Sequence, residues 1–245
     1  MPDGLRIATR HDPIGSAPVA ILVDKPPGDS SFGVVKRVRW ALGEKRVGHA
    51  GTLDPMATGL LIVLVGREAT REQDRFMGLP KVYTGTVRLG QTTPSADAES
   101  PIEERADASS VTDDAVQQAL GAFVGEIVQT PPIYSAIKVG GERLYKKARR
   151  GEDVEVPPRQ VRVTEFTAGP VRPGPDQTVD VDIRVSCSKG TYIRSLARDL
   201  GAAVGVGGHL IVLRREAIGP FQAAEAWNVD ELVAAARLVE PDARP

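Results

Sequence analysis

One segment of the 245-residue chain concentrates residue types that can carry out chemistry. From Val47 to Gly59 it contains three glycines, a histidine, two threonines and a single carboxylate, Asp54. So many turn-forming residues predict a loop rather than a helix or a strand, and the apolar run Leu60–Val65 predicts a buried strand directly after it. A rigid loop beside a buried strand is a common way to present a catalytic carboxylate. Asp54 could be a nucleophile, a general base or a metal ligand, or it could only form a turn with Pro55.

Three other segments contain residues that could take part in the same chemistry. Tyr83 opens a predicted strand, where it could pack against the core, stack on a planar ligand or accept a proton. Arg194 lies in the first turns of a predicted helix and could form a bidentate ion pair with a carboxylate from elsewhere in the chain. Segment 130–160 combines tyrosines with basic side chains, a composition typical of contacts with structured RNA.

Charge is distributed unevenly along a chain whose formal net charge is −1. Residues 25–50 contain six basic and two acidic side chains, and residues 138–150 contain six basic and one acidic. Between them, residues 97–126 contain eight acidic side chains and one arginine. Such segregation would let one face bind a polyanion, although solvated helix faces also carry runs of charge. Charge alone therefore leaves nucleic acid binding as one of two interpretations.

Composition argues against several other classes of protein. The single cysteine, Cys187, excludes an internal disulfide and a cysteine-based zinc site. The three histidines are far apart and lack ligand-type spacing, so we expect no metal, and no fingerprint indicates a cofactor. No apolar stretch approaches the length of a membrane span, and the N-terminus lacks the apolar core of a signal peptide. We therefore expect a cytoplasmic protein without a membrane contact.

Hydrophobic periodicity predicts the elements that must position these residues. Strands are predicted at 19–23, 60–65, 83–89, 161–166 and 179–185, and helices at 31–42, 69–77, 112–123, 192–200 and 229–238. Ser30 or Ser31 should cap the first helix and Gly43 should end it, and Gly201 should end the helix at 192–200. Because strands and helices interleave without a regular βαβ rhythm, we expect a mixed sheet with helices packed on it.

Five motifs in order resemble the TruB family, the bacterial pseudouridine synthases that modify a uridine in the T-loop of tRNA. Residues 48–59 resemble the catalytic motif of that family. The other motifs are Asp24–Gly28 with Ser31-Phe32, the thumb segment Gln129–Gly151, the third motif Cys187–Gly201 and the closing segment Leu213–Phe221. The resemblance covers approximately residues 19–221.

The family's fold is α+β, with a mixed, largely antiparallel β-sheet, helices packed on it and an inserted RNA-binding thumb. The resemblance therefore implies a flexible leader at 1–18, a catalytic domain at 19–221 with a thumb at about 130–160, and a short tail at 222–245. We expect a full C-terminal RNA-binding domain to be absent.

The resemblance also assigns roles to particular residues. Asp54 would be the catalytic carboxylate, Arg194 would pair with it, and Tyr83 would stack on the flipped uracil. Tyr192 and Leu213 would line the pocket. His49 would occupy the space that the flipped base leaves in the RNA. The remaining residues implied in RNA binding are Lys25, Asp97, Lys138, Arg143, Lys146, Lys147 and Arg149, where Asp97 would contact a base or order the site.

Together these expectations describe a stand-alone enzyme that isomerises uridine 55 of tRNA after base flipping. Its partner would be the T-arm of tRNA, with no cofactor, no metal and no obligatory protein partner, and we expect a monomer. Two alternatives remain at the level of sequence. One is a guide-RNA-dependent relative in a ribonucleoprotein, and the other is a structured-RNA binder or tRNA folding chaperone in which catalysis is secondary.

Overall fold

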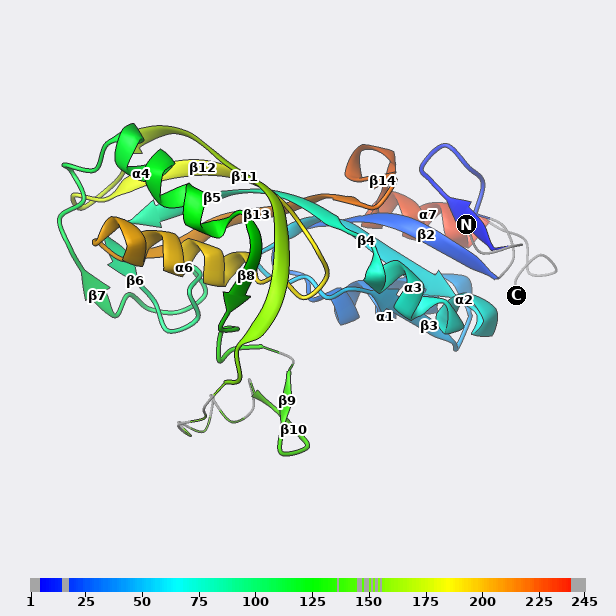
Figure 1. Cartoon of the computed structure of the whole chain (residues 1–245). Helices are drawn as coiled ribbons and strands as arrows, with labels where there is room; N and C mark the ends of the chain where they lie inside the picture. Colours follow the sequence, from blue (N-terminus) through cyan, green and yellow to red (C-terminus); the bar gives the residue numbers. More distant parts are fainter. Residues whose placement is uncertain are drawn as a thin grey trace. The chain divides into compact units, whose positions relative to one another are not determined.

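A computed structural model describes residues 5–14, 18–135, 137–144, 147, 150, 152, 154 and 156–238 (Figure 1). The strands are β1 (Arg6–Ala8), β2 (Val19–Lys25), β3 (Val47–Ala50), β4 (Thr58–Val65), β5 (Lys81–Leu89), β6 (Gln91–Thr92), β7 (Glu104–Arg105), β8 (Gly125–Gln129), β9 (Lys138–Val139), β10 (Glu142–Arg143), β11 (Arg159–Pro173), β12 (Val179–Cys187), β13 (Gly208–Ile218), β14 (Phe221–Gln222) and β15 (Trp227–Asn228). The helices are α1 (Ser31–Leu42), α2 (Arg67–Arg71), α3 (Gln73–Gly78), α4 (Asp113–Leu120), α6 (Ile193–Val204) and α7 (Val229–Leu238).

The predicted α+β class is confirmed. Hydrogen-bonded neighbours in the main sheet follow the order β1-β2-β4-β13-β5-β12-β11-β8, and β3, β14 and β15 pair with β4, β13 and β2. Most of the pairings are antiparallel, as between β2 and β4 and between β11 and β12. The chain divides into two compact units, one formed by residues 1–83 and 213–245 and the other by residues 84–212. Among the described residues, no helix is long and apolar enough to cross a membrane.

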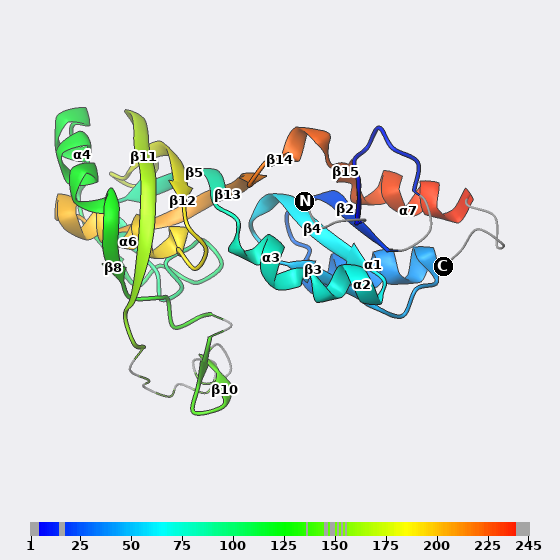
Figure 2. The same ribbon diagram turned by 45° about the vertical axis from the view of Figure 1, so that its right-hand side comes forward.

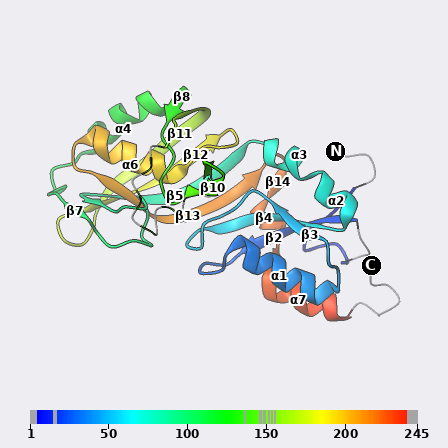
Figure 3. The ribbon, with the colours of Figure 1, turned by 90° about the horizontal axis from the view of Figure 1, so that it is seen from below.

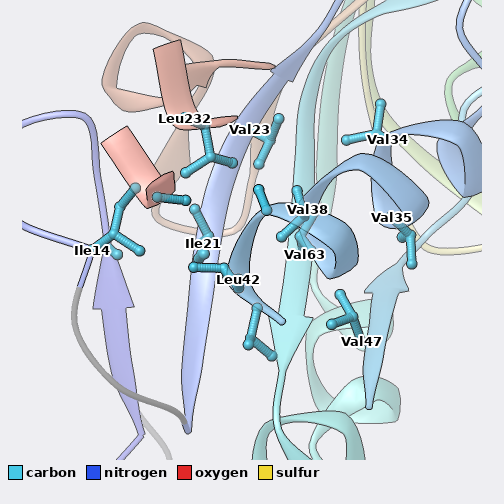
Figure 4. Packing of buried hydrophobic residues seen from close by; sticks show 14 of the residues in the cluster. Ile14, Ile21, Val23, Val34, Val35, Val38, Leu42, Val47, Val63 and Leu232 are labelled. Carbon is cyan, nitrogen blue, oxygen red and sulfur yellow. The ribbon is translucent and has the colours of Figure 1, made fainter. Parts of the chain in front are cut away.

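The first unit is built on the antiparallel pair β2 and β4. Residues Val19–Val23 of β2 and Leu60–Val65 of β4 are apolar, and they are buried because both faces of this pair are covered. One face packs against α1 and α7, where Ile21, Val63 and Leu232 are buried together (Figure 4). The other face packs against α3 and the segment after β13, including Phe76 and Phe221. In Figure 3, α1 and α7 lie side by side. This core supports the loop that contains Asp54.

Helix α1 follows its predicted limits. The Ser30 side chain accepts a hydrogen bond from the Gly33 backbone N–H at 2.9 Å and caps the helix. The helix ends at Gly43, which adopts a left-handed conformation with φ of 68°. Its buried face includes Val34 and Val38, at the spacing of one helical turn.

Three predictions in this unit differ from the structure. The segment expected to be a flexible leader contains β1, which pairs in parallel with β2. The segment expected to be a loop from Val47 begins with β3, because the edge of β4 offers hydrogen bonds that local turn propensity does not reveal. The helix predicted at 69–77 is two short helices, α2 and α3.

The second unit is built on β8, β11 and β12, with α4 and α6 packed beside each other (Figure 2). Thr112 caps α4, as predicted, by accepting a hydrogen bond from the Ala115 backbone N–H at 3.3 Å. Strand β12 alternates buried and exposed residues, which is the pattern that predicted it. Between β8 and β11, within the predicted thumb, β9 and β10 form a short antiparallel hairpin.

The predicted end of α6 at Gly201 is wrong. The helix continues to Val204 and ends at Gly205. Gly201 is instead required by packing, because a Cβ atom at this position would lie 2.2 Å from the Gly208 backbone nitrogen. Here the absence of a side chain lets the helix contact the start of β13 directly.

This contact predicts the effect of the smallest possible side chain. Gly201→Ala should lower the free energy of unfolding by about 1–3 kcal/mol or more, because the backbone on one side must move. Gly78→Ala is a matched control, since a Cβ atom there would have no heavy atom within 4 Å. Urea unfolding of both variants measures the difference, and equal stability of the two would contradict this packing argument.

Candidate active site

Asp54 lies in the loop of residues 51–57 that joins β3 to β4. Its backbone carbonyl accepts a hydrogen bond from the Ala57 N–H at 3.1 Å, so the residue does form a turn. The residue is only half-buried, whereas Leu53 before it and Ala57 after it are buried. The loop therefore buries its apolar side chains and leaves the carboxylate-bearing residue partly accessible.

The peptide before Asp54 is held by the first residue of α1. The Ser31 Oγ donates a hydrogen bond to the Leu53 carbonyl at 3.0 Å and accepts one from the Leu53 N–H at 2.8 Å. Ser31 is buried, so neither hydrogen bond competes freely with water. This reciprocal pair joins the start of a rigid helix to the backbone next to the candidate catalytic residue.

The peptide after Asp54 is held by Lys25 at the end of β2. The Lys25 Nζ donates to the carbonyl oxygens of Pro26 at 2.8 Å, Asp29 at 2.7 Å and Pro55 at 3.1 Å. The Gly28 N–H also donates to the Pro55 carbonyl, at 2.8 Å. Lys25 is fully buried. This placement does not fit the RNA contact that we expected of Lys25, because its ammonium group is used inside the protein to hold the loop.

Arg215 in β13 holds the beginning of the same loop. The buried guanidinium donates to the Gly51 carbonyl at 3.0 Å and to the Leu60 carbonyl at 2.7 Å. The backbone of β13 also packs directly on Gly59, whose φ is +98° and where a Cβ atom would lie 2.3 Å from the Arg215 carbonyl oxygen. Sequence reasoning included Arg215 in the closing motif but missed this role, since the two ends of the contact are 164 residues apart.

The Ser31 contact yields a prediction about stability. Ser31→Ala should lower the free energy of unfolding by about 1–3 kcal/mol, because the buried Leu53 N–H and carbonyl lose their partner. Ser30→Ala is a useful comparison, since it removes a helix cap that is not bonded to the loop. Only the Ser31 variant should also slow turnover of an RNA substrate, and unchanged turnover would contradict its role in holding the loop. Urea unfolding and single-turnover kinetics measure the two effects.

The same unit contains His49, Tyr83 and Leu213. Burial lowers the pKa of His49, with a smaller contribution from the positive charge of Arg215, so the imidazole is neutral at pH 7. Its Nδ1 is buried and has no hydrogen-bond partner among the described residues. Tyr83 is half-buried in β5, and Leu213 is buried in β13. A neutral ring suits the predicted role of His49, which is to occupy the space left by a flipped base, better than an imidazolium would.

In the second unit, Arg194 at the start of α6 forms a buried cluster with Asp97. One guanidinium nitrogen lies 3.3 Å from the Asp97 carboxylate and donates to the Ser95 carbonyl at 3.0 Å. The other terminal nitrogen donates to the Tyr134 carbonyl at 2.9 Å. The Asp97 carboxylate also accepts hydrogen bonds from the Ser95 hydroxyl at 2.5 Å and the Glu99 N–H at 3.0 Å. Asp97 is buried, which supports the ordering role among its two predicted roles. The pairing of Arg194 with Asp54 stays a prediction.

Tyr192, just before α6, is held by an amide that sequence reasoning did not single out. The Gln129 side chain accepts a hydrogen bond from the Tyr192 N–H at 2.8 Å and donates one to its carbonyl at 3.0 Å. The ring faces the Arg159 guanidinium, 5.1 Å from the ring centroid. A glutamine two residues before Pro131-Pro132 was the available signal in the sequence.

The structure describes only some of the basic residues of the predicted thumb. The backbones of Lys138 and Arg143 form the β9–β10 hairpin, and Lys147 is half-buried. Lys146 and Arg149 lie outside the described residues. Arg150 pairs with Glu142 at 2.7 Å and Glu152 at 2.6 Å, and these hydrogen bonds raise its pKa. Its charge is therefore largely used within the thumb.

Comparisons with known proteins show which family this chain resembles. Residues 39–193 match the model of the TruB family pseudouridylate synthase N-terminal domain, and residues 194–244 match the tRNA pseudouridylate synthase B C-terminal domain. The chain is 53% identical over 217 residues to the tRNA pseudouridine synthase B of Thermobifida fusca (strain YX), covering 87% of this chain and 74% of that protein. It is 47% identical over 228 residues to the tRNA pseudouridine synthase B of Mycobacterium leprae (strain TN), covering 91% of this chain and 71% of that protein.

Two solved structures share the fold. One is a Cbf5–Nop10–Gar1 complex, 31% identical with a TM-score of 0.66, and the other is an H/ACA ribonucleoprotein bound to a substrate RNA containing 2′-deoxyuridine, 29% identical with a TM-score of 0.64. Each match covers 88% of this chain but only 53% and 52% of the solved chains, so this chain spans about half their length. The family models, the similar relatives and the ordered motifs agree, and the chain belongs to the TruB family of pseudouridylate synthases.

Proposed function

We propose that this protein converts uridine to pseudouridine in tRNA, at position 55 of the T-loop, as a monomer in the cytoplasm that needs no cofactor or partner protein. Membership of the TruB family and the names of its similar relatives support the activity on tRNA. One structural observation carries the assignment of Asp54, namely that the loop around it is held at Gly51, Leu53 and Pro55 by three buried side chains. Such rigidity suits a residue that must meet a reacting atom within a fraction of an ångström.

The proposed reaction is an isomerisation in which atoms are conserved. The bond between uracil N1 and ribose C1′ breaks, the base rotates, and a bond forms between C5 and C1′. The proton lost from C5 is balanced by one gained at N1, so the reaction consumes neither an oxidant nor water. The uridine must first leave the base stack, which costs a few kcal/mol. In this scheme the neutral His49 ring offsets part of that cost by filling the vacated space.

Asp54 is the proposed catalytic residue, and its neighbours have supporting roles. Attack on the ribose, addition to the base and elimination through a glycal all require an ionised carboxylate at this position. Arg194 would keep Asp54 ionised and oriented, since a neighbouring positive charge favours the charged form. Tyr83 would stack on the flipped uracil, and Tyr192 and Leu213 would line the pocket. Lysine and arginine side chains of the thumb would contact phosphates of the T-arm.

Purified protein and an unmodified tRNA transcript, with no other factor, are enough to test this function. We expect pseudouridine at position 55 and at no other position. A transcript with cytidine at position 55 is the matched control and should stay unmodified. Tight binding of the transcript without pseudouridine would contradict the proposal and would favour a binding or folding role. Modification at a different uridine would contradict the assignment of the T-loop.

A further inference from the structure

Helix α1 carries two exposed aromatic side chains that the proposed active site does not use. Phe32 is 52% exposed and Trp40 is 69% exposed. No other phenylalanine or tryptophan among the described residues is exposed. Residues four apart lie on the same side of a helix, so Phe32, Lys36 and Trp40 form one stripe along α1. The stripe extends about 12 Å, at a rise of about 1.5 Å per residue.

Each aromatic ring of the stripe has a cation over it. The Lys36 Nζ lies 5.0 Å from the centroid of the Phe32 ring. The guanidinium of Arg237, in α7, lies 4.6 Å from the centroid of the Trp40 ring. Within the described part of the chain neither cation forms an ion pair, whereas the neighbouring Arg37 pairs with Asp29 and Asp230. The two positive charges on the stripe are therefore available to an anion. We call Phe32, Lys36, Trp40 and Arg237 the α1 stripe.

The position and the charge of the α1 stripe indicate its partner. The helix begins at Ser31, which holds the loop of Asp54, so a polynucleotide that reaches Asp54 passes close to the start of the stripe. Residues 31–46 contain five basic side chains and one acidic side chain. Exposed rings next to unpaired cations suit unpaired nucleotides, because a base can replace the cation on a ring face while the displaced cation contacts a phosphate. A second copy of this chain would place like charges against each other on this face.

We propose that the α1 stripe binds unpaired nucleotides of the tRNA substrate, as a contact separate from the thumb. This inference rests on the proposed function, because it takes tRNA as the substrate. The stripe contributes affinity rather than chemistry, since none of its residues holds the Asp54 loop. Its two kinds of side chain have separable effects, because stacking is insensitive to salt and phosphate contacts release counterions.

Two double variants test the proposal on a full-length tRNA transcript. Phe32→Ala with Trp40→Ala should raise the Kd about tenfold and leave its salt dependence unchanged. Lys36→Gln with Arg237→Gln should also raise the Kd. It should make the slope of the log of the association constant against the log of the salt concentration shallower by about 1.4, because each contact with a single-strand phosphate contributes about 0.7. In both variants kcat should stay within about twofold of wild type while KM rises.

Matched controls separate the stripe from general effects. Arg105→Gln with Arg172→Gln removes the same charge from exposed arginines that are paired with Asp176 and Asp182, and should leave the Kd unchanged. Thermal unfolding should show that all variants fold, since the buried face of α1 is untouched.

If both stripe variants bind tRNA with the same Kd as the control variant, the inference is wrong. A changed oligomeric state with unchanged tRNA affinity would also overturn it, by indicating a protein interface. Failure of wild-type protein to modify tRNA would instead contradict the proposed function, since the binding series does not depend on turnover.

Discussion

Asp54→Asn should bind an unmodified tRNA transcript with wild-type affinity and form no detectable pseudouridine. We expect the rate of turnover to fall by at least about 10⁴-fold, which is the upper end of the range for removal of a single acid–base group. Asparagine has nearly the same shape as aspartate but carries no charge, so it can neither attack the substrate nor accept a proton at neutral pH. The contacts with Ser31, Lys25 and Arg215 reach the backbone of the loop, and they should survive the substitution.

Single-turnover assays with excess enzyme, together with a binding titration, measure this effect. Asp230→Asn is a suitable control because it removes an exposed carboxylate from the same unit and should leave turnover unchanged. Asp54→Asn that retained more than about one hundredth of wild-type turnover would show that another group supplies the chemistry. Loss of binding together with turnover would show instead that Asp54 supports the loop rather than the reaction.

Arg194→Ala should have two large effects, one on stability and one on turnover. The substitution removes the cation of a buried ion pair and leaves Asp97 charged in the interior, which costs about 3–5 kcal/mol in the free energy of unfolding. It also removes hydrogen-bond donors to the Ser95 and Tyr134 carbonyls. If Arg194 also pairs with Asp54, as we propose, turnover should fall much more than tRNA affinity.

A double variant separates these two effects. Arg194→Met with Asp97→Asn removes both charges, so most of the lost stability should return while turnover stays low. Urea unfolding and single-turnover kinetics of wild type, Arg194→Ala and the double variant give the comparison. Recovery of turnover together with stability would show that Arg194 acts only through Asp97. That result would contradict its proposed contact with Asp54.

Local patterns were sufficient wherever an element depends on its own neighbours in the chain. The pair Ser30-Ser31 predicted the start of α1, Gly43 predicted its end, and strict alternation predicted β12. The order of the motifs was sufficient to predict the family, which the comparisons confirm. Strand β3 was missed because its stability comes from pairing with β4, and turn-rich residues do not reveal such a partner. Gly201 was misread as a helix end because the close approach of Gly208 is invisible in the sequence.

The sequence by itself determined the fold class, the family and the candidate catalytic residue, because these depend on short motifs and on periodicity. Only the tertiary structure shows which side chains hold the Asp54 loop, and that the buried charges of Lys25 and Arg215 bind backbone carbonyls of this loop. Ser31, Lys25 and Arg215 reach the loop across separations of 22, 30 and 164 residues. Burial then decides whether a basic side chain is available to a ligand or is used within the protein, as the contrast between buried Lys25 and exposed Lys36 illustrates. Contacts between residues far apart in the sequence form only when the chain folds, so residue types and their spacing do not reveal which side chains hold the Asp54 loop.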